Sequence, residues 1–159
     1  TINAIVGACF GSSGQRCMAV SVAVLVGDAQ EWIPEIVEKA KTLTIGPGAQ
    51  DPDVGPMITR AAVDRAKDII SKSESDGTKI LLDGRNATVE GYPNGNWLGP
   101  TIIDHSGPGK ISFDEEIFAP VMAIVRVDTL KEAIDVLNGH RFGNGVSIFT
   151  RSGGNARKF

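Results

Sequence analysis

The chain has 159 residues, of which 42% are hydrophobic and 22% are charged, and its formal net charge at pH 7 is −3. A chain of this length typically folds as one domain around one core, and an acidic balance without a lysine or arginine run argues against a nucleic-acid-binding protein. The longest apolar run is far shorter than the ~20 residues that cross a bilayer, and the N-terminus lacks the layout of a signal peptide. We therefore expect a soluble, intracellular domain without nucleic-acid or membrane partners.

Apolar periodicity predicts alternating helices and strands in the first half of the chain. In order, we expect a helix, a strand, a second helix and a loop rich in glycine and proline, at residues 1–9, 20–26, 28–43 and 46–56. Asp28 and Glu31 have capping-box spacing at the start of the second helix, and Pro34 fits only its first turn. The loop lacks the lysine and hydroxyl of a phosphate-binding loop, so we expect it to be structural.

The second half continues the alternation. We expect a helix, a strand, a surface excursion, an extended segment, a strand, a helix and a last strand, at residues 60–77, 79–82, 86–96, 97–103, 117–127, 130–139 and 146–150. Thr59 can cap the first of these helices, on which we expect Arg65 to lie in solvent. Thr129 and Glu132 form a capping box for the second helix. The alternation predicts a three-layer α/β/α domain with a mainly parallel sheet.

The two cysteines and two histidines do not predict a metal site. Two cysteines are too few for a disulfide framework or a cysteine-only zinc site. Neither His105 nor His140 stands at metal-ligand spacing from a cysteine. Cys9 shares the apolar face of the first helix, so we expect it to be a packing residue and expect no structural metal.

The segment from Phe10 to Met18 concentrates the most chemistry. Cys17 follows Arg16 after a run with two glycines and two serines. The thiolate is the nucleophilic form of cysteine, and a nearby cation favours it. Backbone N–H groups around Cys17 can also stabilise an oxyanion. The spacing alone leaves a second interpretation open, in which Cys17 is a small buried hydrophobe.

Two motifs in this sequence resemble those of the aldehyde dehydrogenase superfamily. Gly14-Gln15-Arg16-Cys17 is similar to its cysteine motif, and the segment from Glu115 to Val121 is similar to its Glu-Glu-Ile-Phe-Gly-Pro-Val segment, with Ala119 in place of the usual glycine. Within the superfamily, the sequence from Gly14 to Gly27 resembles the methylmalonate-semialdehyde dehydrogenases. Smaller matches at residues 91–96 and 99–103 extend the resemblance over essentially the whole chain.

The resemblance implies that residues 1–159 are the cysteine-bearing catalytic domain of a longer enzyme. The NAD-binding domain and the C-terminal oligomerisation segment of the family would lie outside this chain, so we expect the isolated chain to be inactive. The family's glutamate base would also lie upstream, and we assign no general base. The whole enzyme is expected to be a homo-oligomer, a dimer or a tetramer, in the mitochondrial matrix of a eukaryote or the cytoplasm of a bacterium.

The resemblance also implies a reaction and roles for four residues. Cys17 would attack the aldehyde of methylmalonate or malonate semialdehyde, a hydride would leave to NAD, and coenzyme A would take the acyl group with loss of carbon dioxide, giving propionyl-CoA or acetyl-CoA. Arg16 would bind the substrate carboxylate, since its planar fork suits that group. Glu116 would accept hydrogen bonds from the nicotinamide ribose, and Phe118 would pack near the nicotinamide.

Each of these roles has an alternative. Arg16 is otherwise a solvent ion pair or a thiol activator, Glu116 a surface acid, and Phe118 a core residue. For the whole chain, three further hypotheses remain: a non-acylating aldehyde dehydrogenase, a non-catalytic α/β assembly module, and a hydrolase or acyltransferase that pairs Cys17 with His105 or His140.

Overall fold

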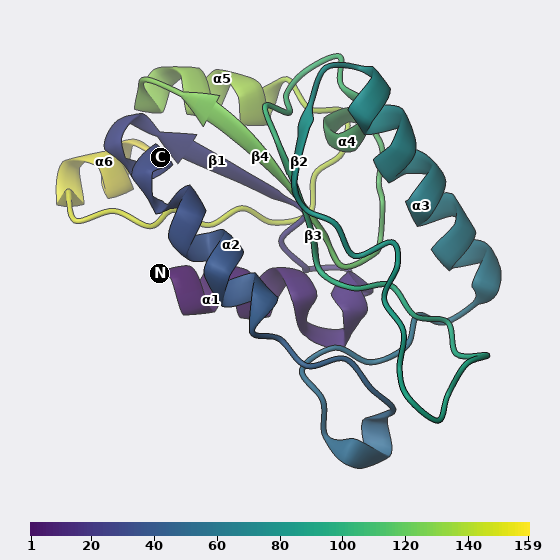
Figure 1. Ribbon diagram of the computed structural model, residues 1–159. Helices are drawn as coiled ribbons and strands as arrows, with labels where there is room; N and C mark the ends of the chain where they lie inside the picture. The colour runs from purple at the N-terminus through teal and green to yellow at the C-terminus, as the bar shows by residue number, and fades with distance from the viewer.

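A four-stranded sheet lies at the centre of the computed structural model, which describes residues 1–159 (Figure 1). The strands are β1 (Val22–Val26), β2 (Lys79–Leu82), β3 (Thr101–Asp104) and β4 (Val121–Val127). Their order in the sheet is β1-β4-β3-β2. β4 runs parallel to both β1 and β3, and β2 pairs antiparallel with β3. The prediction of a mainly parallel sheet is therefore confirmed.

Helices surround this sheet. They are α1 (Ile2–Phe10), α2 (Ile33–Lys41), α3 (Arg60–Ser75), α4 (Ile111–Asp114), α5 (Leu130–Asn138) and α6 (Gly153–Lys158), with short 3-10 helices η1 (Gly11–Gly14), η2 (Gly27–Trp32) and η3 (Gly48–Gln50). Thr59 caps α3 by accepting a hydrogen bond from Ala62 N–H, as predicted. The predicted capping box of Thr129 and Glu132 begins α5. No helix combines the length and the apolar character needed to cross a membrane.

Two buried clusters, one on each face of the sheet, join the sheet to a layer of helices on either side. The first joins α1, α2 and alternate sheet residues, including Met122 and Ile124 of β4. The second joins α3 to the opposite sheet face, including Ile103 and Val121. Successive side chains of a strand point to opposite faces, so one short apolar strand can serve both cores. The observed layers match the α/β/α prediction.

Two local predictions were wrong. Residues 146–150 form no strand; Val146 and Phe149 are 59% and 50% exposed, and β propensity without a paired neighbour does not make a strand. Asp28 and Glu31 form no capping box, because they lie in η2 and α2 begins only at Ile33, with Pro34 in its first turn.

β3 begins later than the extended segment predicted at 97–103, whereas β4 begins next to Pro120, where the proline in the segment 117–127 predicts its start. β3 starts directly after Pro100 and β4 directly after Pro120. Proline has no N–H to donate to a sheet ladder. Both strands therefore begin at the residue that follows a proline.

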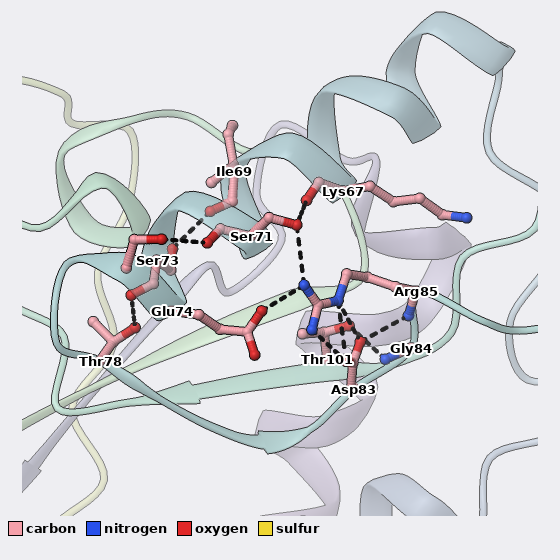
Figure 2. A network of polar contacts seen from close by, with 11 residues as sticks. Lys67, Ile69, Ser71, Ser73, Glu74, Thr78, Asp83, Gly84, Arg85 and Thr101 are labelled. Atoms are coloured by element: carbon pink, nitrogen blue, oxygen red, sulfur yellow. Dashed lines mark hydrogen bonds and ion pairs between the residues drawn. The ribbon is translucent and has the colours of Figure 1, made fainter.

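A polar network connects β2, the antiparallel edge strand of the sheet, to α3 (Figure 2). Arg85, just after β2, donates from Nη1 to Ser71 Oγ at 3.0 Å and to Glu74 Oε2 at 2.6 Å, both on α3. Its Nη2 donates to Asp83 Oδ2 at 2.6 Å. Hydrogen bonding from this guanidinium lowers the pKa of Asp83. The network ties α3 to the end of β2.

Candidate active site

The loop that carries Cys17 is held by hydrogen bonds to a distant loop. Ser12 and Ser13, inside η1, have φ values of 51° and 55°, which non-glycine residues rarely adopt. Ser13 Oγ donates to Gly55 O at 2.7 Å, and Gln15 Oε1 accepts from Ile58 N–H at 2.9 Å. These two contacts fix the unusual backbone path that leads to Cys17.

Cys17 lies at the exposed tip of a turn. The turn is closed by Ala19 N–H donating to Arg16 O at 3.0 Å. Asn144 Nδ2 donates to Cys17 O at 2.6 Å, so the carbonyl is fixed, whereas the N–H of Cys17 has no acceptor within the protein. The thiol is accessible, and the interpretation of Cys17 as a buried hydrophobe is wrong.

Cys9 differs from Cys17 in its exposure to solvent. It is fully buried in the core between α1, α2 and the sheet. Burial strongly raises the pKa of its thiol, and the nearby Arg16 charge offsets this only in part. The predicted packing role of Cys9 is confirmed, because a thiol in this position is neither accessible nor ionised near neutral pH.

Arg16 binds the end of α1. Its Nη2 donates to Gly7 O at 3.1 Å and to Ala8 O at 2.7 Å. A cation at a helix C-terminus satisfies unpaired carbonyls and interacts favourably with the helix dipole. Arg16 forms no ion pair, and its Nη1 and Nε have no acceptor in the protein. These two donor groups therefore remain available, and Arg16 and Cys17 line the same groove.

β1 and β4 are parallel, so the second motif and Cys17 lie at the same end of these two strands. Val22 pairs with Ala123, and Cys17 and Phe118 each precede these partners by five positions. The backbones of the two motifs touch: a Cβ added to Gly14 would lie 2.1 Å from Ala119 O. Gly14 also has a φ of 65°, so both its conformation and this close approach require glycine.

Three consecutive acids, Asp114 and the first two residues of the second motif, have different partners. Asp114 accepts hydrogen bonds from Gly109 N–H. Glu115 Oε1 accepts from Arg141 Nη2 at 2.8 Å. The carboxylate of Glu116 forms no ion pair and no hydrogen bond, and Glu116 is exposed. It is therefore the acid of this segment that is available to an outside donor.

Exposed and buried side chains alternate in this motif. Phe118 is 41% exposed, whereas Ile117 and Ala119 are each 5% exposed. The Ala119 methyl packs in the cluster around α3. Ala119, which stands where the family usually has glycine, is buried and lies at the wall of the groove. Phe118 is not a core residue.

One groove of about 1050 Å³ collects all four predicted site residues. Cys17 and Arg16 line it from one motif, and Glu116 and Phe118 from the other. Its remaining lining includes β1, α5 and residues 142–150. Of these last residues, Asn144 contacts the turn that carries Cys17 and was not predicted. No local pattern pointed to it, because it is 127 positions from Cys17.

Neither histidine is placed as a catalytic partner of Cys17. His140 Nε2 bonds Phe113 O at 2.7 Å, and its Nδ1 accepts from Phe142 N–H at 3.0 Å. His105 does not line the groove and lies 3.7 Å from Asp104. Neither ring is hydrogen-bonded to Cys17, so the geometry disfavours a cysteine-histidine hydrolase. No three His, Cys, Asp or Glu side chains are grouped to hold a metal ion.

Comparison with known proteins gives consistent matches over the whole chain. Residues 1–159 match the model of the aldehyde dehydrogenase family. The chain is 49% identical over 160 residues to the mitochondrial methylmalonate-semialdehyde/malonate-semialdehyde dehydrogenase [acylating] of Bos taurus, covering 100% of this chain and 30% of that protein. The chain thus spans about a third of the length of the relatives it matches.

Two crystal structures share its fold closely. The methylmalonate-semialdehyde dehydrogenase of Oceanimonas doudoroffii superposes with a TM-score of 0.95 at 43% identity, covering 99% of this chain and 33% of that one. A provisionally named methylmalonate-semialdehyde dehydrogenase of Sinorhizobium meliloti, complexed with NAD, also gives a TM-score of 0.95, at 39% identity and the same coverage.

Proposed function

This chain belongs to the aldehyde dehydrogenase family, and we propose that its 159 residues are the cysteine-bearing catalytic domain of a longer, NAD-dependent semialdehyde dehydrogenase that transfers its acyl product to coenzyme A. The observation that carries this proposal is the groove that brings Cys17 together with Glu116 and Phe118. The acylating activity in the names of relatives at 49% identity supports the choice of coenzyme A as acceptor.

Cys17 is the proposed nucleophile. Its exposed thiol attacks the aldehyde carbonyl as the thiolate, and the carbonyl oxygen becomes an oxyanion. The backbone N–H of Cys17, which has no acceptor in the protein, is available to donate to that oxygen. The hydrogen bond from Asn144 to the Cys17 carbonyl fixes the peptide unit that follows the nucleophile.

The residues beside Cys17 fit a nicotinamide cofactor. Glu116 offers an exposed carboxylate without an internal partner, which suits two ribose hydroxyl donors. Phe118 offers an exposed aromatic face in the same groove. When bound, NAD would accept the hydride that leaves the tetrahedral adduct on Cys17. A thioester then remains on the sulfur, and the thiol of coenzyme A displaces the acyl group and restores Cys17.

Arg16 is the proposed contact for the substrate carboxylate. Its Nη2 is bound to α1, while Nη1 and Nε have no protein acceptor. The hydrogen bonds to α1 fix the guanidinium in a groove that Cys17 also lines, and there it would bind methylmalonate or malonate semialdehyde by its charged end. Loss of carbon dioxide from the acyl group on Cys17, with uptake of a proton at the α-carbon, leaves a propionyl or acetyl thioester, and transfer of that group to coenzyme A gives propionyl-CoA or acetyl-CoA.

The whole enzyme is proposed to act as a homo-oligomer. The name of the Bos taurus relative places that protein in mitochondria. We therefore propose the mitochondrial matrix for this enzyme if it is eukaryotic, and the cytoplasm if it is bacterial.

The test uses the longer parent enzyme and follows NADH formation with methylmalonate semialdehyde and with propanal, each with and without coenzyme A. We expect Cys17→Ala to abolish oxidation and Cys9→Ala to retain it. Arg16→Leu should lose activity toward the carboxylated substrate by roughly 100-fold, the value of a charged hydrogen-bonded pair. Its activity toward propanal should change much less.

The substrate ratio separates the two roles of Arg16. A weakened α1 terminus alone would reduce the oxidation of both aldehydes equally, which would exclude carboxylate recognition. Oxidation at the same rate without coenzyme A would leave only a non-acylating aldehyde dehydrogenase. Full activity of Cys17→Ala would refute the proposed chemistry altogether.

A further inference from the structure

Arg65 on α3 makes a contact that its predicted position in solvent did not suggest. Its Nη2 donates to Glu116 O at 2.6 Å, and its Nη1 donates to Ile117 O at 3.0 Å. One planar guanidinium therefore binds two consecutive carbonyl oxygens of the second motif. Arginine suits this task because its donors have a fixed fork geometry, whereas the ammonium group of lysine is a single donor centre.

The two carbonyls depend on this side chain. Residues 115–120 lie between α4 and β4 and belong to no helix or strand. No backbone N–H donates to the carbonyl of Glu116 or Ile117, so Arg65 is their hydrogen-bond partner within the protein. The contact to Ile117 O is partly buried, and a carbonyl away from water needs such a partner. Arg65 thus replaces the backbone ladder that this segment lacks.

The bend held by Arg65 is not a relaxed one. Consecutive carbonyls of an extended strand point to opposite sides, whereas one guanidinium meets both of these. The next residue, Phe118, has a φ of 53°, a left-handed conformation that is unfavourable for an aromatic residue. A strained backbone persists only when surrounding contacts determine it. The fork of Arg65 is one such contact, and burial of Ile117 is another.

This bend sets the direction of two groove residues. Glu116 and Phe118 are exposed in the groove, whereas Ile117 and Ala119 are buried at its wall. Arg65 itself does not line the groove. Any effect of Arg65 on a bound cofactor must therefore act through the carbonyls that it holds.

We propose that Arg65 is a positioning residue that fixes Glu116 and Phe118 for the cofactor. The inference rests on the proposed function, since it assigns Glu116 and Phe118 to NAD. The Cys17 turn has its own supports, through Ser13, Gln15 and Asn144. Replacing Arg65 should therefore weaken cofactor binding and leave the nucleophile in place.

The experiment compares Arg65→Met and Arg65→Lys with Arg60→Met in the parent enzyme. Arg60 is the first residue of the same helix, and its one contact is a long 3.4 Å hydrogen bond to Gly95 O. Three quantities are measured: the KM for NAD and kcat, the rate at which iodoacetamide modifies Cys17 with and without NAD, and the thermal midpoint.

We expect Arg65→Met to raise the KM for NAD roughly tenfold or more, the loss expected when hydrogen bonds to a charged cofactor-binding group become misaligned. The kcat at saturating NAD should fall much less. NAD should protect Cys17 poorly in this variant, while modification without NAD proceeds at the wild-type rate. The KM for NAD and the protection of Cys17 in Arg65→Lys should lie between those of the wild type and Arg65→Met. Arg60→Met should match the wild type.

The outcomes separate this inference from the proposed function. If the wild type neither reduces NAD nor is protected by it, both are overturned. If the wild type does both and Arg65→Met has the same KM and the same protection, the positioning role alone is overturned. A lower thermal midpoint with unchanged KM in Arg65→Met would assign Arg65 to stability only and would equally overturn the role.

Discussion

The two edges of the sheet are completed in opposite ways. At the β2 edge, Arg85 joins the strand to α3 through Ser71, Glu74 and Asp83, and its own side chain is only 21% exposed. At the β1 edge lies the groove with Cys17. Except for Ile58 and Tyr92, all of the large apolar side chains that are more than a third exposed line this groove.

The polar groups of the β2 edge contribute to stability, whereas those of the β1 edge are available to a ligand. At the β2 edge, polar groups bind one another, so they add to the fold and have nothing left for a ligand. At the β1 edge, the Glu116 carboxylate and the Cys17 N–H have no internal partner. We expect substitutions at the β2 edge to change the free energy of unfolding and substitutions near Cys17 to change its reactivity.

The largest effect is expected at Gly14, where the two motifs touch. Gly14→Ala would place a Cβ 2.1 Å from Ala119 O at a φ of 65°, so the loop that leads to Cys17 must move. A displacement of about 1 Å at a reacting group costs roughly 100-fold in rate. We expect that loss in NADH formation by the parent enzyme.

Two glycines provide the controls for Gly14→Ala. Gly7 in α1 has open space around its Cα, so Gly7→Ala should leave the rate unchanged and stabilise the helix by about 0.5–1 kcal/mol. At the β2 edge, a Cβ on Gly84 would lie 2.0 Å from Gly99 O. Gly84→Ala should lower the thermal midpoint and spare the modification rate of Cys17; equal loss of reactivity would contradict the separation of the two edges.

Acid should weaken both edges together, because Asp104 and Arg126 join β3 to β4 between them. Arg126 donates to Asp104 from Nε at 2.9 Å and Nη2 at 2.5 Å, and the Asp104 side chain is 2% exposed. Burial would raise the pKa of Asp104, but hydrogen bonds from Arg126 and from His105 N–H outweigh it and lower that pKa.

The lowered pKa determines the sign of the pH dependence. The pair stabilises the fold fully above the unfolded-state pKa of about 4, and this stability is lost as pH falls below it through the folded-state pKa. Asp104→Asn should cost about 2–3 kcal/mol at pH 7, below the ~3–5 kcal/mol of a fully buried broken pair because Arg126 is partly exposed. Denaturant unfolding at pH 7 and pH 3 checks this, and an equal cost at both would contradict it.

A smaller effect is expected from Arg85→Met. The variant removes the contacts to Glu74 and Asp83 and should lower the free energy of unfolding by about 1–2 kcal/mol, because these partners are themselves partly exposed. Chemical denaturation measures the loss. Iodoacetamide should modify Cys17 at the wild-type rate, and a slower reaction would show that the β2 edge also supports the site.

The smallest effect on stability is expected from Phe149→Ser. Phe149 is half exposed in the groove, so the free energy of unfolding should stay within about 0.5 kcal/mol. Binding of an apolar fluorescent dye should fall, because the side chain contributes to the exposed apolar surface. A cost above about 1 kcal/mol would mean that Phe149 packs as a core residue.

The sequence predicted the elements that depend on local chemistry. Thr59 and the pair of Thr129 and Glu132 cap their helices because capping needs only residues three positions apart. The segment at 146–150 has the composition of a strand, but a strand also needs a neighbour, which local sequence does not encode. The extended segment predicted at 97–103 was too long because β3 begins only after Pro100.

The candidate site was predictable in its residues and not in its supports. Cys17, Arg16, Glu116 and Phe118 were found through two motifs, and the parallel register of β1 and β4 explains why motifs a hundred positions apart share one groove. Arg65 and Asn144 were missed because each acts on a carbonyl far along the chain. Every residue has a backbone carbonyl, so the residue type of the acceptor does not reveal such a hydrogen bond.

The contrast between the two cysteines has a practical consequence for spectroscopy. Cys9 is fully buried with a raised pKa, whereas Cys17 is exposed. With respect to mild thiol reagents, the chain behaves as a protein with one cysteine. A fluorophore or spin label should therefore attach to Cys17 alone without any substitution at Cys9, and report on the groove while the core stays native.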